Sequence, residues 1–270
     1  MPTPGSDRER ASARIVEAYA DLNGARLSDV ERSFIDQAAA DWSADDLADW
    51  SARDLAAAAS ALWRAGAARQ DQAPWIGLRA IQAPEAAHIL EIVQPDAPFL
   101  VASVMGAIVE AGARVRAMIH PVIETGGGRR SLMQVILAPL ANPEALTSAV
   151  EAALADVWAA VRDFEAMRQA MREAIAGLER ADRGSDEERA FLRWLDEGRF
   201  VFLGTRAYAY PAAEDATPEP IADTGLGVLR NPDLQIVRQA NDAAVDAALA
   251  GRRGLGHPAV TVAKANLISR

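Results

Sequence analysis

The stretch HILEIVQPDAPFLVASVMGAIVEAGARVRAMIHPVI, His88 to Ile123, decides the fold of this chain. It opens with a continuous apolar run, Ile89 to Val93, which predicts a buried strand, and it closes with an alternating run, Val115 to Ile119, which predicts a second strand. Between the two runs, Asp96 is a suitable N-cap for a helix that Gly112 ends. The stretch therefore predicts a strand, a helix and a strand in close succession.

The residues that follow add a hairpin and a third strand. The glycine-rich segment Thr125 to Arg129 predicts the turn, and Leu132 to Ala138 predicts the returning strand. An order of strand, helix, strand, strand suits a ferredoxin-like α+β sandwich. We expect Val104 and Ile108 of the helix to face the sheet. Their expected strand neighbours are Leu90, Ile92, Val115 and Ile119.

A long amphipathic helix follows this unit. Apolar residues recur at helical spacing from Pro143 to about Arg180, and 38 residues would span about 57 Å. We assign residues 85–180 to one α+β domain of βαββα order that ends in this long helix.

The residues before this domain indicate a helical leader, 1–70, and a linker, 71–84. One helix fits Arg8 to Leu22, and a second fits Ser28 to Ala40, where Ser28 and Glu31 form a capping box. A doubled phrase predicts two further short helices, at Ser43 to Trp50 and Ser51 to Trp63. The linker carries prolines and one short predicted strand, Trp75 to Ile81.

The residues after the long helix, 185–270, predict the start of a second α/β module that is cut short. FLRWLDEGRFVFLGTRAYAY, Phe191 to Tyr210, predicts a helix that ends at Gly198 and runs into a strand with alternating aromatic residues. Phe200 and Phe202 should share one face of this strand. Further expected elements are a loop at Pro211 to Pro220, strands at Val228–Leu229, Leu234 to Val237 and Ala259 to Ala263, and a helix at Asp242 to Leu249.

The order of these motifs resembles a known family. FLRWLDEGRFVFLGTRAYAY, TGLGVLR at Thr224 to Arg230 and the final TVAKANLISR resemble the N-terminal regulatory half of the large bacterial NAD-specific glutamate dehydrogenases. The stretch His88 to Ile123 looks like that family's first ACT-like domain. The resemblance covers roughly residues 30–270. It implies an enzyme that oxidises L-glutamate to 2-oxoglutarate and ammonium with NAD, where NAD binds outside this segment. The implied partners are the remainder of the same polypeptide and the subunits of a homo-oligomer.

The resemblance also implies a binding site for a small effector such as an amino acid. In ACT-like domains, effectors bind at the loop between the first strand and the first helix. The effector-binding residues expected here are Gln94, Asp96, Ala97 and Phe99. The helix N-terminus offers backbone N–H groups to a carboxylate, and Asp96 can hold an ammonium group. In the alternative, Asp96 is a plain N-cap that needs no ligand.

No catalytic, cofactor or metal residues are predicted within the chain. The pair Gly225 and Gly227 lacks the third glycine of a dinucleotide fingerprint, and Gly254-Leu255-Gly256 runs into a His-Pro pair that no Rossmann helix would tolerate. The three histidines, His88, His120 and His257, have no metal-ligand spacing. The single lysine is Lys264, near the end of the chain. We therefore expect this segment alone to be inactive as a dehydrogenase.

Composition narrows the partners and the location. The 270 residues carry a formal net charge of −10, which argues against nucleic acid and anionic membranes as partners. There is no cysteine, so no disulfide framework is possible, and this favours a cytoplasmic protein. The N-terminus lacks the apolar core of a signal peptide.

A second interpretation comes from a different class of protein. The chain would then be a stand-alone ACT-type sensor that binds a small amino acid and acts on a partner protein. An open reading frame that continues well past Arg270 would favour the dehydrogenase, and a stop codon there would favour the sensor. The identity of the effector is open in both cases.

Overall fold

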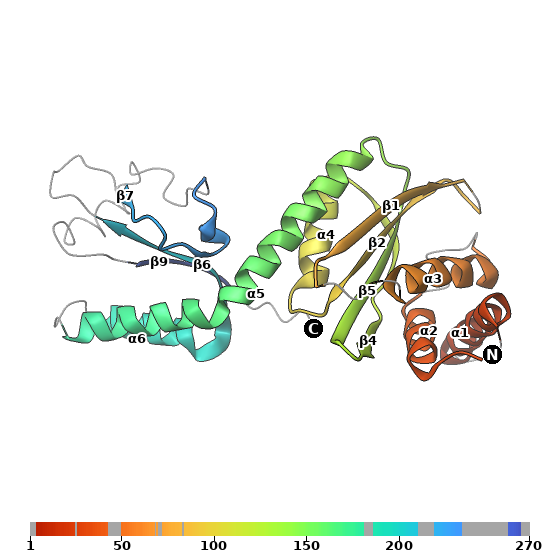
Figure 1. The fold of residues 1–270 in the computed structure, drawn as a ribbon, viewed down its shortest axis with the longest axis horizontal. Helices are drawn as coiled ribbons and strands as arrows, with labels where there is room; N and C mark the ends of the chain where they lie inside the picture. The colour runs from red at the N-terminus through yellow and green to blue at the C-terminus, as the bar shows by residue number, and fades with distance from the viewer. Residues whose placement is uncertain are drawn as a thin grey trace. The chain divides into compact units, whose positions relative to one another are not determined.

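The computed structural model describes residues 4–24, 26–42, 50–67, 69, 72–82, 84–180, 186–209, 219–233 and 259–265. These residues form two compact units, Met1–Leu154 and Ala155–Arg270 (Figure 1). The division falls inside the long helix α5, Pro143–Arg180, whereas the sequence suggested domains that meet at residues 180–185.

The first unit opens with three helices, α1 (Pro4–Asn23), α2 (Asp29–Asp41) and α3 (Ala52–Ala67). The predicted capping box of α2 is half formed, since the Ser28 hydroxyl accepts a hydrogen bond from the Glu31 backbone N–H at 3.2 Å. Ser51 and Asp54 form a reciprocal box before α3, with N–H to oxygen distances of 3.2 and 2.9 Å. The helix expected at Ser43 to Trp50 falls almost wholly on residues 43–49, outside the described part of the chain.

A five-stranded antiparallel sheet forms the centre of the first unit. Its strands are β1 (Trp75–Ile81), β2 (Ala87–Pro95), β3 (Val115–Ile119), β4 (Val122–Thr125) and β5 (Gly128–Leu137). The spatial order is β1-β2-β5-β3, and β4 also pairs with β5. Strand β1 pairs with β2 along its whole length, so most of the expected linker 71–84 is an edge strand of the sheet. Prolines stand just outside β1, where the sheet needs no N–H donor from them.

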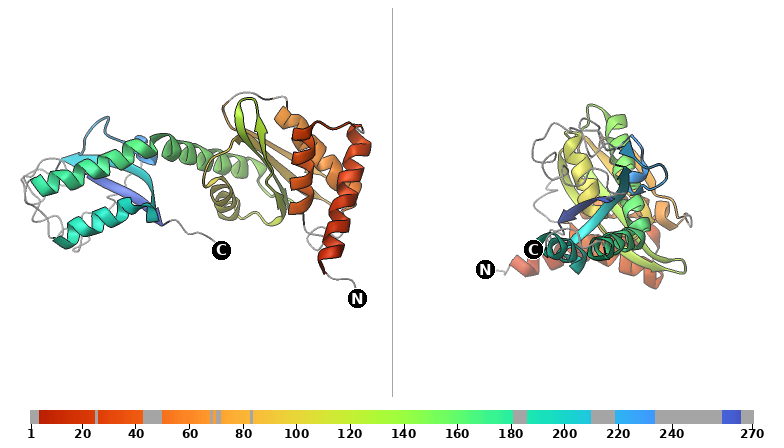
Figure 2. Two further views of the ribbon diagram at one scale, coloured as in Figure 1. Left: turned by 90° about the horizontal axis from the view of Figure 1, so that it is seen from below. Right: turned by 90° about the vertical axis from the view of Figure 1, so that its left-hand side faces the viewer.

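Helices cover both faces of this sheet. Helices α1 to α3 lie on one face, while α4 (Leu100–Glu110) and the start of α5 lie on the other (Figures 1 and 2). Val104 and Ile108 are fully buried, as expected. However, Ile119 belongs to the cluster under α1 to α3, so its expected contact with the α4 side is wrong. Because helices cover both faces of the sheet, apolar residues occur on both sides of each strand. The alternation of polar and apolar residues therefore does not show which helices a given residue contacts.

The start of α4 also differs from the expectation. Asp96 does not cap the helix, because α4 begins at Leu100 and its N-cap is Phe99, a left-handed residue with φ 70° and no side-chain cap bond. The reason is Pro98, which disfavours helical backbone at the residue before it. The end of α4 is as expected. Gly112, with φ 70°, forms the double hydrogen-bond pattern of a Schellman cap.

The second unit contains the rest of α5, then α6 (Asp186–Trp194) and a π-helical turn, Leu195–Arg199. Around the central strand β6 (Phe200–Ala209) lie the antiparallel strands β7 (Glu219–Pro220), β8 (Leu226–Gly227) and β9 (Ala259–Ala265). The strand expected at Val228–Leu229 is instead part of a 3-10 turn, Val228–Arg230. Residues 211–218, Leu234 to Val237 and Asp242 to Leu249 lie outside the described residues.

Strand β6 carries a bulge that the sequence pattern did not indicate. Its pairing with β9 shifts between Phe202 and Gly204. Because the shift inserts one residue, Phe202 and Tyr208 lie on opposite faces although both positions are even-numbered. Phe202 packs with Met167, Met171 and Ile175 of α5. Both aromatic side chains are buried, so the strand is covered on each face.

Candidate effector site

The expected effector loop lies where β2 ends and α4 begins. Gln94 is fully buried in β2, where it pairs in register with Ser131 of β5. Ala97 is half-buried, and the Phe99 side chain is 40% exposed. The loop therefore places one expected residue inside the sheet and another at the surface.

Asp96 is held at this position by β5. Its backbone N–H donates to the Arg129 carbonyl at 2.9 Å, and its carboxylate lies 3.2 Å from the Arg129 guanidinium. The Arg129 side chain is 61% exposed and lies 3.7 Å from Glu124 as well. Asp96 is therefore a fixed carboxylate whose present cation partner is exposed to solvent.

Two residues that the sequence did not assign to this site lie beside the loop. The His120 ring Nε2 is 2.7 Å from the Ser131 hydroxyl, and the His120 backbone N–H donates to Asp41 of α2 at 2.8 Å. Burial lowers the pKa of His120, while the charges of Asp96 and Asp41 act in the opposite direction. The lowered pKa of His120 favours the neutral form of its imidazole.

The sequence offered one signal for this cluster. Gln94 and Ser131 are polar residues inside strands whose other members are mostly apolar. Gln94 and Ser131 are neighbours only because β2 pairs with β5. Their spacing in the sequence could not predict this contact.

The first turn of α4 completes the site. No side chain caps this helix, and the first backbone N–H groups of a helix have no partner within the helix. Asp96 precedes this first turn in the loop between β2 and α4. This arrangement suits a small zwitterion, which carries one charge of each sign.

The glycine motif of the second unit has a structural role. The Gly227 N–H donates to the Asp163 carboxylate at 2.8 Å, and Arg230 donates to the same carboxylate at 2.5 and 2.9 Å. The Arg230 hydrogen bonds lower the pKa of Asp163 to about 2. A Cβ atom at Gly227 would lie 2.1 Å from the Leu203 carbonyl oxygen. We call Asp163, Gly227 and Arg230 the aspartate clamp, which fixes the TGLGVLR segment to α5.

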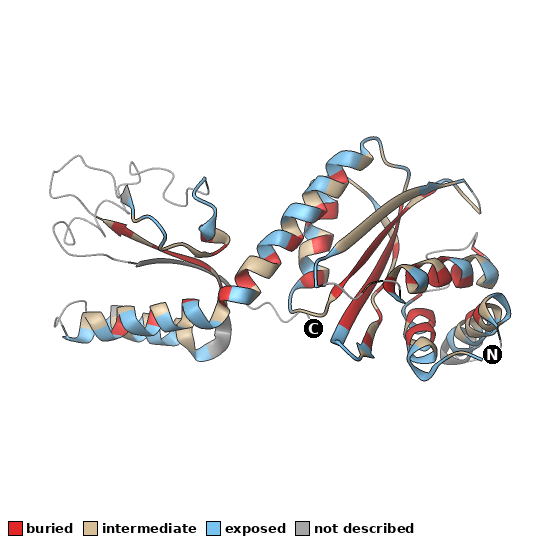
Figure 3. Cartoon of the chain, viewed as in Figure 1, coloured by how far each residue is buried: buried red, intermediate tan, exposed pale blue. Residues whose placement is uncertain are grey.

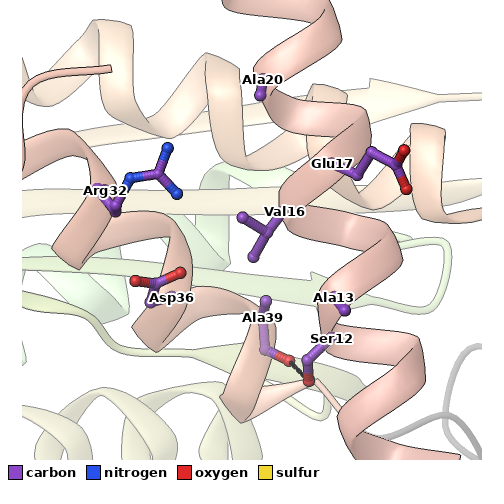
Figure 4. A pocket seen from close by; sticks show the side chains of 8 residues that line it. All are labelled: Ser12, Ala13, Val16, Glu17, Ala20, Arg32, Asp36 and Ala39. Carbon is purple, nitrogen blue, oxygen red and sulfur yellow. Dashed lines mark hydrogen bonds between the residues drawn. The ribbon is translucent and has the colours of Figure 1, made fainter. Parts of the chain in front are cut away.

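A shallow groove of about 460 Å³ lies between α1 and α2. Figure 4 shows Val16 of α1 opposite Arg32 and Asp36 of α2, and the hydrogen bond from Ser12 to the Ala39 carbonyl. Arg32 and Asp36 are both exposed. This groove lacks any fixed pair of polar groups that would orient a ligand, so it is a weaker candidate than the loop.

The described residues contain neither a candidate metal centre nor a candidate membrane-spanning helix. They hold no group of three or more His, Asp or Glu side chains that could bind a metal. Among them, no helix has the length and apolar character that crossing a bilayer requires.

The fold and the loop define an α+β domain of the ACT-like class, with a long helix. The family model for the glutamate dehydrogenase ACT1 domain matches residues 34–179, from α2 to the end of α5. The match spans more than half of the chain, which therefore belongs to this family. No curated protein matches the chain.

Proposed function

We propose that the chain is the N-terminal regulatory and assembly segment of an NAD-dependent glutamate dehydrogenase. The observation that carries this proposal is the family match over residues 34–179, which spans the five-stranded sheet, helices α3 and α4, and the candidate loop. In this proposal the enzyme converts L-glutamate and NAD to 2-oxoglutarate, ammonium and NADH. The catalytic centre and the NAD site lie outside this segment, and its partners are the rest of the polypeptide and further subunits.

The roles of the glycine motif and of the single lysine support a segment that does not itself catalyse the reaction. Glycines 225 and 227 serve the aspartate clamp and a tight turn, where a Cβ atom would meet backbone oxygens at 2.2 and 2.1 Å. The lone lysine, Lys264, is a member of β9 and pairs with Val201. We therefore expect no NADH from glutamate with this chain alone.

The effector in this proposal is a small amino acid bound at the loop of residues 94–99. Its carboxylate would accept hydrogen bonds from the first turn of α4. Its ammonium group would pair with Asp96 in place of the exposed Arg129 side chain. An exposed ion pair contributes little free energy, so this exchange costs little.

The test has two readouts on the purified chain. NADH formation from glutamate and NAD should equal the blank. Thermal unfolding with a panel of free amino acids should show a higher Tm with at least one of them, and Asp96→Asn should abolish that shift. Glu124→Gln is the matched control, since Glu124 also contacts Arg129 but lies outside the loop. NADH formation above the blank contradicts the absence of catalysis, and a panel without any shift contradicts effector binding.

A further inference from the structure

Helix α1 ends at a chemically reactive pair of residues, Asn23 and Gly24, which is the only Asn-Gly pair in the sequence. The backbone nitrogen that follows an asparagine can attack the side-chain amide carbon, and glycine has no side chain to hinder its approach. Gly24 is exposed and has φ 96°. No atom of the described residues lies within 4 Å of the position that its Cβ would take.

The Asn23 side chain is held by two hydrogen bonds. Its amide nitrogen donates to the Tyr19 carbonyl at 3.0 Å, and its amide oxygen accepts from the Ser60 hydroxyl of α3 at 2.5 Å. Tyr19 is fully buried and Ser60 is 3% exposed. Figure 3 shows buried residues along α3. Asn23 therefore fastens the end of α1 to a buried position of α3.

These contacts oppose the reaction in the folded chain. Closing the ring joins the Gly24 nitrogen to Asn23 Cγ, so the amide must turn away from both of its partners. The backbone at Asn23, which is helical, must also change its conformation. The buried Ser60 hydroxyl would lose this acceptor, which is unfavourable. The reaction therefore requires the end of α1 to open locally from α3.

We propose that Asn23 is a site of spontaneous deamidation, which the contact between α1 and α3 restrains and which weakens that contact once it has occurred. The Gly24 nitrogen forms a bond to Asn23 Cγ and loses its proton, and the side-chain nitrogen leaves as ammonia. The product is a cyclic imide. Water then adds to one of the two imide carbonyl carbons, and the bond from that carbon to the nitrogen breaks. This gives aspartate or isoaspartate at position 23, with no oxidation or reduction and with water as the co-reactant.

The other asparagines of the chain are poorer sites for this reaction. Asn142 and Asn231 each precede a proline, whose nitrogen carries no hydrogen. Asn241 precedes an aspartate and Asn266 precedes a leucine, and both following residues carry side chains that hinder the attack. We therefore expect deamidation at position 23 before any other position.

Deamidation changes the end of α1 in three ways. A carboxylate cannot donate to the Tyr19 carbonyl, so that hydrogen bond is lost. The new negative charge lies at the C-terminal end of a helix, where the helix dipole disfavours it. The isoaspartate product also adds one carbon to the main chain. Each change weakens the attachment of α1 to α3.

The first test measures the rate of deamidation in the purified chain by peptide mapping with mass spectrometry. The peptide that contains Asn23 should gain the mass of water and lose that of ammonia, slowly in the folded wild type and faster in urea. Ser60→Ala removes the hydroxyl that holds the amide, so it should speed the reaction of the folded chain by about fivefold or more. Ser148→Ala, at an exposed position of α5, is the matched control and should leave the rate unchanged.

The second test measures the effect of the product and does not depend on how well Ser60→Ala folds. Asn23→Asp should lower the midpoint of thermal unfolding. The same change at the start of α5, Asn142→Asp, should not lower it. Asn142 accepts the Ala145 N–H at 3.1 Å, and a negative charge is favourable at a helix N-terminus.

Three outcomes would overturn the proposal. No reaction at Asn23 in the urea-unfolded chain would mean that the pair is not reactive. Equal rates in the folded wild type and in urea would mean that α3 does not restrain it. An unfolding midpoint of Asn23→Asp equal to that of the wild type would mean that the modification does not weaken the contact. Glutamate, NAD and amino acids are absent from both tests, so the result is independent of the proposed function.

Discussion

In each unit, a single polar residue holds a loop or strand end against a neighbouring helix or strand. Asp163 is buried on α5 and ties a loop to the helix through Arg230 and the Gly227 N–H. His120 joins α2 to β5 through its backbone and its ring. Such residues carry charge or a titratable ring, so their contributions to stability depend on pH.

Asp163→Asn should lower the free energy of unfolding by about 1–3 kcal/mol at pH 7, because a charge-assisted contact is lost at a buried site. The folded pKa of Asp163 lies below its ordinary value, at about 2. Its contribution is therefore complete above about pH 4 and is lost as the pH falls towards about 2. Urea unfolding of both proteins across this range should show the difference shrink. A constant difference would mean that the carboxylate charge plays no part.

His120→Gln should flatten the pH dependence of stability below neutrality. Burial lowers the folded pKa of His120, so the unfolded chain takes up the proton first as the pH falls below about 6.5. The wild-type chain should lose stability in that window, and the variant should lose less. Equal slopes of Tm against pH for the two proteins would show that His120 is not buried in this way.

The sequence predicts the positions of most helices and strands, but it does not predict which distant segments pair or pack with one another. The caps at Ser28, Ser51 and Gly112 act within a few residues, so their motifs could be recognised. The bulge in β6 and the polar cluster of Gln94, His120 and Ser131 depend on pairing between distant segments. Of the candidate site, the loop was predictable from the resemblance, and the residues behind it were not.

Gly227→Ala should destabilise the second unit by about 2 kcal/mol or more. The new Cβ would meet the Leu203 carbonyl oxygen at 2.1 Å, and the backbone has φ 61°, which disfavours side chains. Gly106→Ala is the matched control, since nothing lies within 4 Å of its Cβ position in α4. That change should stabilise the chain by up to about 1 kcal/mol. Chemical denaturation of both variants checks the pair, and a tolerated Gly227→Ala would contradict the clamp geometry.

Ile108→Ala should cost about 2–5 kcal/mol, because the side chain is fully buried between α4 and the sheet. Val109→Ala, one residue further along α4, removes a side chain that is 67% exposed and should change the stability little. Unfolding midpoints of the two variants test the face of α4. A cost for Ile108→Ala below about 0.5 kcal/mol would contradict the packing.

In the whole molecule, the family match and the candidate loop fall in the same α+β domain. The chain belongs to the glutamate dehydrogenase ACT1-domain family, and its candidate loop combines a fixed carboxylate with an uncapped helix N-terminus. Catalysis is proposed to reside elsewhere in the enzyme. Regulation by this segment requires that a ligand at the loop changes activity at another site.

The most direct test is an amino-acid titration of glutamate-dependent NADH formation by the enzyme that carries this segment. We expect at least one amino acid other than glutamate to change the rate. Asp96→Asn should raise the concentration needed for half of that change by about tenfold or more, as a lost charge-assisted contact predicts. Glu124→Gln should leave that concentration unchanged. An effector response that is identical in Asp96→Asn and wild type would contradict the account.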